Sequence, residues 1–210
     1  MLAFEPPTQF ACSVSMKLKT TLFAVLWMAQ SMSAQVADFQ QEFQSINKDL
    51  MLGLGSFAVT NFVVSGIGYT TAQDESVQRF HEMNMMWNTV NLGLAVPGYL
   101  KARKSTELMS LAEMTREQRK TERIFLVNSA LDLGYIGAGA WMRSAAQNQS
   151  DQEALFRGYG NSLIFQGSFL LAFDAFAYYM HHRHAKQLPE LERVSVQMTG
   201  QGFGLRVALD

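Results

Sequence analysis

The stretch Ile124–Met142, IFLVNSALDLGYIGAGAWM, decides how this chain folds. It contains no Lys or Arg, and it is apolar on almost every face of a helix, with one carboxylate, Asp132, near its midpoint. Ser162–Met180 has the same character and carries Asp174. A helix of a soluble bundle would instead show a polar outer stripe. At about 1.5 Å per residue, each stretch can cross a hydrocarbon core of roughly 30 Å, so both are predicted to span a membrane.

Two further segments complete a predicted four-helix transmembrane bundle. They cover about Leu50–Ala72 and Met83–Leu100 and carry almost no charge. The second of them is the weakest of the four, because it includes three Asn residues and Pro97. Asp132 adds an insertion cost of about 2.5–3.5 kcal/mol to its own segment, so that helix should insert only with partners. The predicted fold class is all-α, with the membrane bundle over residues 51–187.

The amino terminus has the pattern of a secretion signal. Two lysines precede the apolar run Thr20–Ala29, and small residues then offer a cleavage site before Gln35. Residues 1–34 are therefore predicted to be an extension and a signal peptide, with translation starting at Met16. The only cysteine, Cys12, precedes that start, so the mature chain would have no disulfide, thiolate metal site or cysteine nucleophile.

Two short elements flank the predicted bundle. Apolar residues recur at three–four spacing over residues 35–50, which predicts an amphipathic helix on the membrane surface or on a neighbouring helix. Residues 188–210 alternate apolar and polar side chains around Gly200–Gly202, which predicts a short C-terminal β-hairpin. Capping-box patterns at Thr115–Gln118 and Ser150–Glu153 predict where the third and fourth helices begin.

The distribution of basic residues conflicts with the predicted signal. If all four segments span, the connection 101–123, residues 35–50 and the carboxyl terminus share one side of the membrane. That side holds most of the Lys and Arg residues, which favours a cytoplasmic position. A cleaved signal would place the same side outside the cytoplasm. The sequence therefore predicts a bacterial membrane protein, of the inner membrane, without fixing its orientation.

Polar side chains recur near the middle of all four segments, and we name this group the polar seam. Intramembrane polar groups are costly in lipid and are expected to face the interior of a bundle. Counted from the ends of their segments, these residues lie within one or two helical turns of the same membrane depth, so their side chains could contact one another. The polar seam consists of Asn61, Asn88, Asn91, Asn128, Asp132, Gln166 and Asp174.

Two interpretations of the polar seam stay open. In the first, amides and carboxyls hold the helices together by interhelical hydrogen bonds, typically worth about 0.6 kcal/mol each. In the second, Asp132 and Asp174, which have no basic residue in their segments, form a site for a proton, a cation or a polar ligand. The glycine-flanked aspartate motif of intramembrane aspartyl proteases is missing, so no catalytic residue is predicted.

Histidines are the remaining candidates for ligands. His181, His182 and His184 follow the fourth segment and are weak candidates for binding a metal or haem. His81 begins the second segment, on the opposite side of the membrane under the four-span prediction, so it cannot complete one ion site with them. Beside Arg183, the three histidines are better explained as a basic cap at the interface. No metal or cofactor is predicted.

Composition and motifs argue against several function classes. The 210 residues are 48% hydrophobic and 17% charged, with a net charge of −1, which leaves no basic surface for nucleic acid. The sequence has no His-Glu-x-x-His, Gly-x-Ser-x-Gly or phosphate-binding glycine loop. The predicted partners are membrane lipid and other membrane or envelope proteins, and a homo-oligomer is compatible with the sequence.

Three strings of this sequence resemble an uncharacterised family of small four-helix membrane proteins from Bacteroidota. They are Met83–Gly93 (MNMMWNTVNLG), Asn128–Tyr135 (NSALDLGY) and Gly158–Asp174 (GYGNSLIFQGSFLLAFD). The resemblance would cover roughly residues 40–185. It implies a bacterial source and a membrane location, and it carries over no activity and no catalytic residue.

The sequence thus favours a non-enzymatic integral membrane protein of the bacterial envelope that acts through protein interactions, with the polar seam holding the bundle together. The alternative is a small permease or an ion- or proton-handling subunit that uses Asp132 and Asp174. A third interpretation is a soluble envelope bundle that binds an apolar ligand and needs no detergent.

Overall fold

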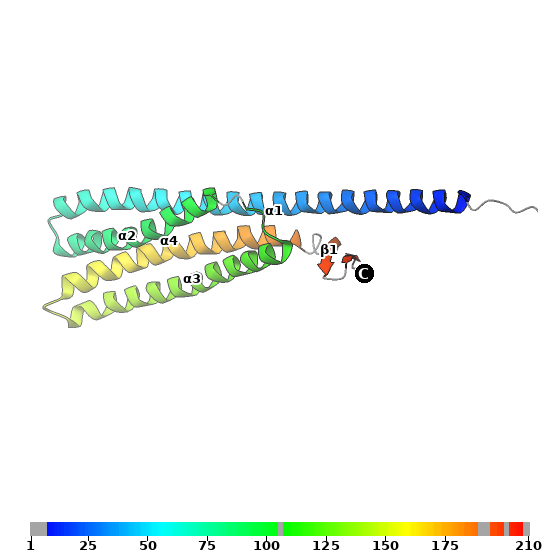
Figure 1. Ribbon diagram of the computed structural model, residues 1–210. Coiled ribbons are helices and arrows are strands. Elements are labelled where there is room, and N and C mark those ends of the chain that lie inside the picture. Colours follow the sequence, from blue (N-terminus) through cyan, green and yellow to red (C-terminus); the bar gives the residue numbers. More distant parts are fainter. Residues whose placement is uncertain (1–7, 105–106, 189–193, 200–201, 208–210) are drawn as a thin grey trace, which may run out of the picture.

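Long apolar runs separated by short polar connections fold into four helices. The computed structural model describes residues 8–104, 107–188, 194–199 and 202–207 (Figure 1). The elements, in chain order, are α1 (Thr8–Thr71), α2 (Glu75–Lys104), α3 (Leu111–Ala145), the 3-10 helix η1 (Ala146–Asn148), α4 (Glu153–Ala185), β1 (Val194–Thr199) and β2 (Gly202–Val207). The predicted all-α class with a four-helix bundle is confirmed.

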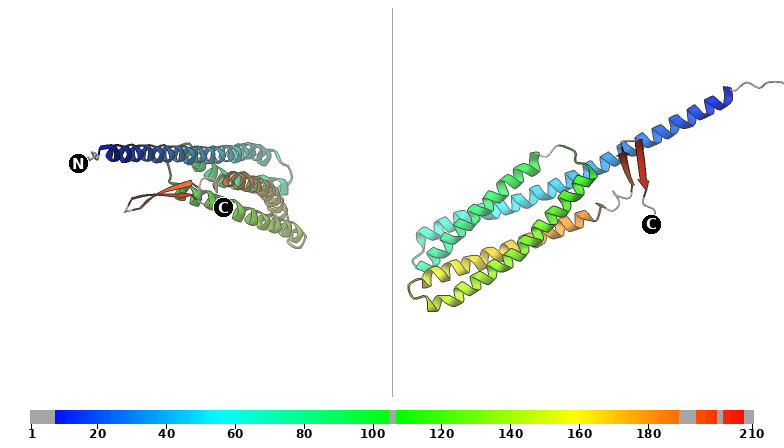
Figure 2. Two further views of the ribbon diagram at one scale, coloured as in Figure 1. Left: turned by 90° about the vertical axis from the view of Figure 1, so that its right-hand side faces the viewer. Right: turned by 60° about the horizontal axis from the view of Figure 1, so that its bottom comes forward.

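The helices pack side by side in the order α1, α2, α4, α3 (Figures 1 and 2). Chain direction alternates along the sequence, so α2 and α4 run parallel and form the central pair, while α1 and α3 lie on the outside. The two outer helices approach each other where Leu50 of α1 and Phe125 of α3 share a buried cluster. Toward the end that carries the two tight turns they draw apart (Figure 1). The result is a flattened bundle held together through α2 and α4.

α1 combines two predicted elements in one helix. The predicted amphipathic segment 35–50 continues into the first apolar segment without a break. Phe39 of this segment joins Met114 of α3 and Leu188 in one buried cluster. Of the two positions expected for the segment, the structure therefore supports packing on neighbouring helices. The predicted cleavage site before Gln35 lies inside the same helix, and cleavage stays a prediction.

α3 begins earlier than the sequence pattern predicted, because a different capping box starts it. The Glu113 backbone N–H donates to the Ser110 hydroxyl at 3.4 Å, and the Ser110 backbone N–H donates to the Glu113 carboxylate at 2.9 Å. Hydrogen bonds from the backbone and then the hydroxyl of Ser110 lower the pKa of Glu113. The box predicted at Thr115–Gln118 is wrong, since Thr115 lies inside α3. The box predicted at Ser150–Glu153 is also wrong, since the N-cap of α4 is Gln152, which makes no side-chain capping bond.

The interior of the bundle contains many polar side chains, while large apolar side chains are exposed on its surface. Asn88 is fully buried on α2, whereas Val90 and Leu94 of the same helix are 53% and 60% exposed. On α3 the pattern repeats, with Asp132 buried and Leu131 half exposed. Soluble proteins rarely leave large contiguous apolar surfaces in water. Large apolar side chains exposed on all four helices include Leu52, Val59, Val63, Val64, Ile67, Met86, Val96, Leu126, Val127, Leu133, Phe165 and Phe176.

Three of the helices are long and apolar enough to cross a membrane. They are the parts Ser33–Thr71, Leu111–Asn148 and Glu153–Ala185. The segment within α2, which the sequence analysis identified as the weakest, is not among them. The physical reason is that hydropathy averages all faces of a helix, and the buried face of α2 consists largely of amides. The coarser prediction of membrane-compatible helices therefore holds for three of the four.

Glycines let α3 and α4 pack closely. A Cβ atom added to Gly160 of α4 would lie 2.7 Å from the carbonyl oxygen of Gly139 on α3. One added to Gly167 would lie 3.1 Å from the carbonyl oxygen of Asp132. Because lipid supplies no hydrophobic drive between helices, membrane bundles rely on such small residues for close contact.

The carboxyl-terminal strands form a separate two-stranded element. β1 and β2 pair antiparallel, with Val194 opposite Val207 and Thr199 opposite Gly202. Residues 200 and 201, on which the predicted turn falls, lie outside the described residues.

Candidate functional site: the polar seam

In the structure, residues of the polar seam lie in two separate centres. The first joins α2 to α4 and is built around Asn84. The second joins α3 to α4 and consists of Asp132 and Asp174. Gln166 in the first centre and Asp174 in the second are eight residues apart on α4, which is about 12 Å along a helix. The two centres are therefore distinct sites at different depths.

Asn84 connects α2 to α4 through side-chain hydrogen bonds. Its side-chain oxygen accepts hydrogen bonds from the Ser162 hydroxyl at 2.8 Å and from the Gln166 amide at 2.9 Å. All three side chains are buried. Because α2 and α4 are the central pair, this three-residue centre holds the α1–α2 half of the bundle to the α3–α4 half.

The other two amides of α2 continue the same stripe along the helix. The Asn88 amide donates to the Asn84 backbone carbonyl at 2.7 Å, one helical turn away. The Asn91 amide in turn donates to the Asn88 side-chain oxygen at 3.4 Å. Both residues are buried. The spacing of three and four residues places all three amides on the face that packs against α4.

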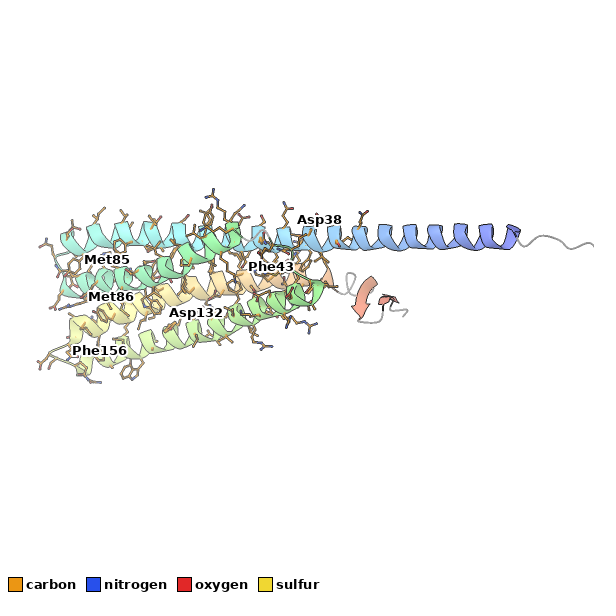
Figure 3. The ribbon with its side chains drawn as sticks, viewed as in Figure 1. Asp38, Phe43, Met85, Met86, Asp132 and Phe156 are labelled. Carbon is orange, nitrogen blue, oxygen red and sulfur yellow. The ribbon has the colours of Figure 1, made fainter. Side chains whose placement is uncertain are left out.

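The carboxyl groups of Asp132 on α3 and Asp174 on α4 face each other. A hydrogen bond between them requires a proton on one of the two groups, because two carboxylates only accept. Asp132 lies near the middle of α3 (Figure 3), and both side chains are buried. In the described part of the chain neither carboxyl has a basic partner, and one oxygen of Asp132 has no hydrogen bond.

Asn61 and Asn128 stand apart from both centres. The Asn61 amide donates to the Phe57 carbonyl at 3.1 Å, within its own helix α1, and the residue is partly buried. Asn128 is partly buried on α3, one turn before Asp132. The seven residues were predicted to meet in one cluster. In the structure they lie instead in pairs or along a single helix.

A second polar group lies at the opposite end of the bundle from the tight turns. The Gln118 amide of α3 donates to the His181 backbone carbonyl at 2.6 Å, and its oxygen lies 3.1 Å from Nδ1 of His184. The His184 ring stacks on Phe39 of α1, with ring centroids 3.9 Å apart, and its Nε2 lies 3.7 Å from the Glu42 carboxylate. This group joins α1, α3 and α4.

The three candidate histidine ligands do not converge on one point. His182 is exposed and lies 3.9 Å from Glu122, while His181 and His184 are buried. His181 packs between the rings of Phe43 and Phe125, and neither of its ring nitrogens has a hydrogen bond. Among the described residues there is no group of three or more side chains that could hold a metal ion.

Sequence reasoning identified one of the two connecting residues only in part. The three–four spacing predicts that Asn84 shares one helix face with Asn88 and Asn91, but Asn84 is not among the predicted seam residues. Gln118 stands among charged residues in TREQRKTER, where nothing in the pattern sets it apart. Gln118 is buried because α3 approaches α1 at this end of the bundle. Such a contact between distant segments cannot be read from the local sequence.

Comparison with known proteins places the bundle in one family. A family model described as a family of unknown function (DUF6992) matches residues 53–175. This range contains the whole polar seam and ends before the histidines at the end of α4. The expected membership of an uncharacterised family is confirmed, while the Bacteroidota source stays a prediction. No curated protein and no solved structure matches the chain.

Proposed function

The chain belongs to this family of unknown function, and we propose that it is an integral membrane protein of the bacterial envelope in which all four helices cross the bilayer. The observation that carries the proposal is the combination of polar residues buried between the helices with large apolar residues exposed on the outer surface. In water, surfaces such as those around Leu94 and Leu131 would be unfavourable, whereas in lipid they are the expected outer surface. The same observation disfavours a soluble envelope bundle.

The geometry of α2 supports its inclusion among the spanning helices. α2 lies between α1 and α4 and packs along both, so it must share their depth. Its outward side chains Met86, Val90 and Leu94 are apolar and exposed. Its amides reduce the average hydropathy of the segment, but Asn84, Asn88 and Asn91 face the bundle and are satisfied there.

We infer that the protein acts through contacts with other membrane or envelope proteins rather than through chemistry. The Asn84 oxygen, the Ser162 hydroxyl and the Gln166 side-chain N–H are used in bonds between helices, so they are not free to bind a substrate. The connection 101–123 presents an exposed basic surface outside the membrane segments, and such a surface suits partner contacts. Its exposed basic residues are Lys101, Arg103, Lys104, Arg116, Arg119, Lys120 and Arg123.

The test is fractionation of cells that express the full chain, with a sodium carbonate wash of the membranes and mass determination of the amino terminus. We expect the chain to stay in the washed membranes and to need detergent for release. Release by carbonate would contradict the proposal. A mature start at Gln35 would place residues 35–50 and the basic connection outside the cytoplasm, and an intact terminus would place them inside.

One observation favours a second candidate function, the handling of protons or cations. The carboxyl groups of Asp132 and Asp174 face each other in the bundle interior, and they have no basic partner in the described part of the chain. In proteoliposomes with an imposed pH gradient, this function predicts that the wild-type chain dissipates the gradient and that D132N/D174N does not. D151N, in an exposed turn, is the matched control and should behave as wild type. Equal dissipation of the pH gradient by all three chains would contradict this function and would show that Asp132 and Asp174 form only a structural contact.

A further inference from the structure

An open groove of 520 Å³ runs along one face of α4 and reaches α3. Five of its six lining residues come from one face of α4, and Arg143 comes from α3. At its deep end, Phe57 of α1 stacks on Phe169 with ring centroids 3.3 Å apart. The groove lies toward the tight turns, where α1 and α3 draw apart (Figure 1). Its lining residues are Arg143, Asn161, Ile164, Phe165, Ser168 and Phe169.

Arg143 gives this groove a charge that the protein does not neutralise. At the same end of the bundle, Arg79 pairs with both Glu75 and Glu82, and Arg157 pairs with Glu153 at 2.7 Å. In the described part of the chain Arg143 has no carboxylate partner.

The groove combines this cation with an amide and an apolar wall. Asn161 beside Arg143 has no side-chain hydrogen bond among the described residues and can donate to an anion. Beyond it, Ile164, Phe165 and Phe169 make the walls mainly apolar. The ligand that fits must carry an anionic group at one end and a hydrocarbon chain behind it.

The position of the groove relative to the membrane defines that ligand further. Arg143 directly follows the apolar segment 124–142, beside Trp141, which is 65% exposed at the level where aromatic side chains mark the membrane–water interface. From Asn161 to Phe169 the groove descends about 12 Å along α4. That is close to the depth of one leaflet of a core about 30 Å thick.

We propose that this groove binds an anionic phospholipid from the surrounding membrane, with its phosphate at Arg143 and Asn161 and one acyl chain along Ile164, Phe165 and Phe169. The inference rests on the proposed membrane location. Charge complementarity favours an anionic over a zwitterionic headgroup, because the Arg143 guanidinium has no carboxylate partner and can neutralise the net negative charge of an anionic lipid. The apolar walls of the groove favour a membrane lipid over a free phosphate, because a free phosphate would make no contact with them.

The experiment measures thermal stabilisation of the full chain in mild detergent as lipid is added. Phosphatidylglycerol, phosphatidylcholine with the same acyl chains, and inorganic phosphate are titrated in parallel. R143Q removes the charge, and R157Q, at the same end but ion-paired, is its matched control. S168F fills the groove from an exposed position, and A140F adds the same ring on the exposed face of α3.

Phosphatidylglycerol should stabilise the wild-type chain at lower concentration than phosphatidylcholine, and inorganic phosphate should have no effect. R143Q should weaken the phosphatidylglycerol effect roughly five- to tenfold, the contribution expected of one interfacial cation. S168F should abolish it, while R157Q and A140F should retain it.

Three results would overturn the inference: equal effects of the two lipids, equal losses in R143Q and R157Q, or reproduction of the effect by inorganic phosphate. A change of oligomeric mass in S168F with the lipid effect intact would also overturn it, by showing that the groove receives a second copy of the chain. A chain that carbonate releases from membranes defeats the membrane proposal itself. A chain that stays in the membrane but shows no dependence on Arg143 defeats only the lipid site.

Discussion

The replacement of Asn84 by leucine tests how the two halves of the bundle are joined. Leucine has a similar size but removes the oxygen that accepts from Ser162 and Gln166. Interhelical hydrogen bonds in membrane proteins contribute about 0.6 kcal/mol on average and up to about 1.7 kcal/mol. Two such bonds, with two buried donors left unpaired, lead us to expect that N84L lowers the free energy of unfolding by about 1–3 kcal/mol.

N61L is the matched control for this substitution. Asn61 also lies in an apolar segment, but its amide donates only to the Phe57 carbonyl of its own helix. Both variants gain the same apolar side chain, so the difference between them isolates the bonds between α2 and α4. We expect N61L to change the free energy of unfolding by less than about 0.5 kcal/mol.

The assay is reversible unfolding by SDS in mild detergent, followed by far-UV circular dichroism. Equal losses in N84L and N61L would refute the reasoning, because they would show that the bonds of Asn84 add nothing beyond the presence of an amide in the segment. A loss in N84L that disappears in the combined background of S162A and Q166L would support it, since the partners are then absent in both chains.

Three further predictions use the same unfolding assay. H181F should be neutral or stabilising, because it replaces a buried ring without hydrogen bonds by an apolar ring, whereas Q118L should cost about 1–3 kcal/mol by leaving its buried partners unpaired; the opposite order would contradict this account of the histidine end. G160A should destabilise by about 1–3 kcal/mol through a clash across the α3–α4 contact, while G134A, with open space around it, should not; equal effects would argue against close packing there. S110A should cost about 1 kcal/mol as a lost N-cap, and an unchanged midpoint would mean that α3 does not begin at this residue.

The number and positions of the helices could be predicted because the apolar segments are long and sharply bounded by charge. Asp132 and Asp174 were predictable as interior residues for the same reason, since a carboxyl in an apolar segment must face a partner. The depth argument placed all polar residues near one level, yet it could not show which helices are neighbours. That required the order α1, α2, α4, α3, which follows from contacts such as that of Gly139 with Gly160.

The helix starts were mispredicted for a local reason. Ser110 and Glu113 form the same box pattern as Thr115 and Gln118, and the sequence alone does not decide between two boxes so close together. The structure favours the earlier one because Met114, just inside it, is buried against α1. Both boxes are equally suitable N-termini for α3 by local sequence, and tertiary packing therefore determines which of them is used.

We propose that all four helices, α2 included, lie in the bilayer with their apolar faces outward. Single nitroxide labels at V90C and L131C, in a chain whose only cysteine has been replaced, measure this directly in proteoliposomes. The account predicts that both labels are more accessible to dissolved oxygen than to a water-soluble nickel complex, with the reverse at D151C in the exposed turn. A label at Val90 that the nickel complex reaches as readily as the one at Asp151 would contradict the claim, because it would place the outer face of α2 in water.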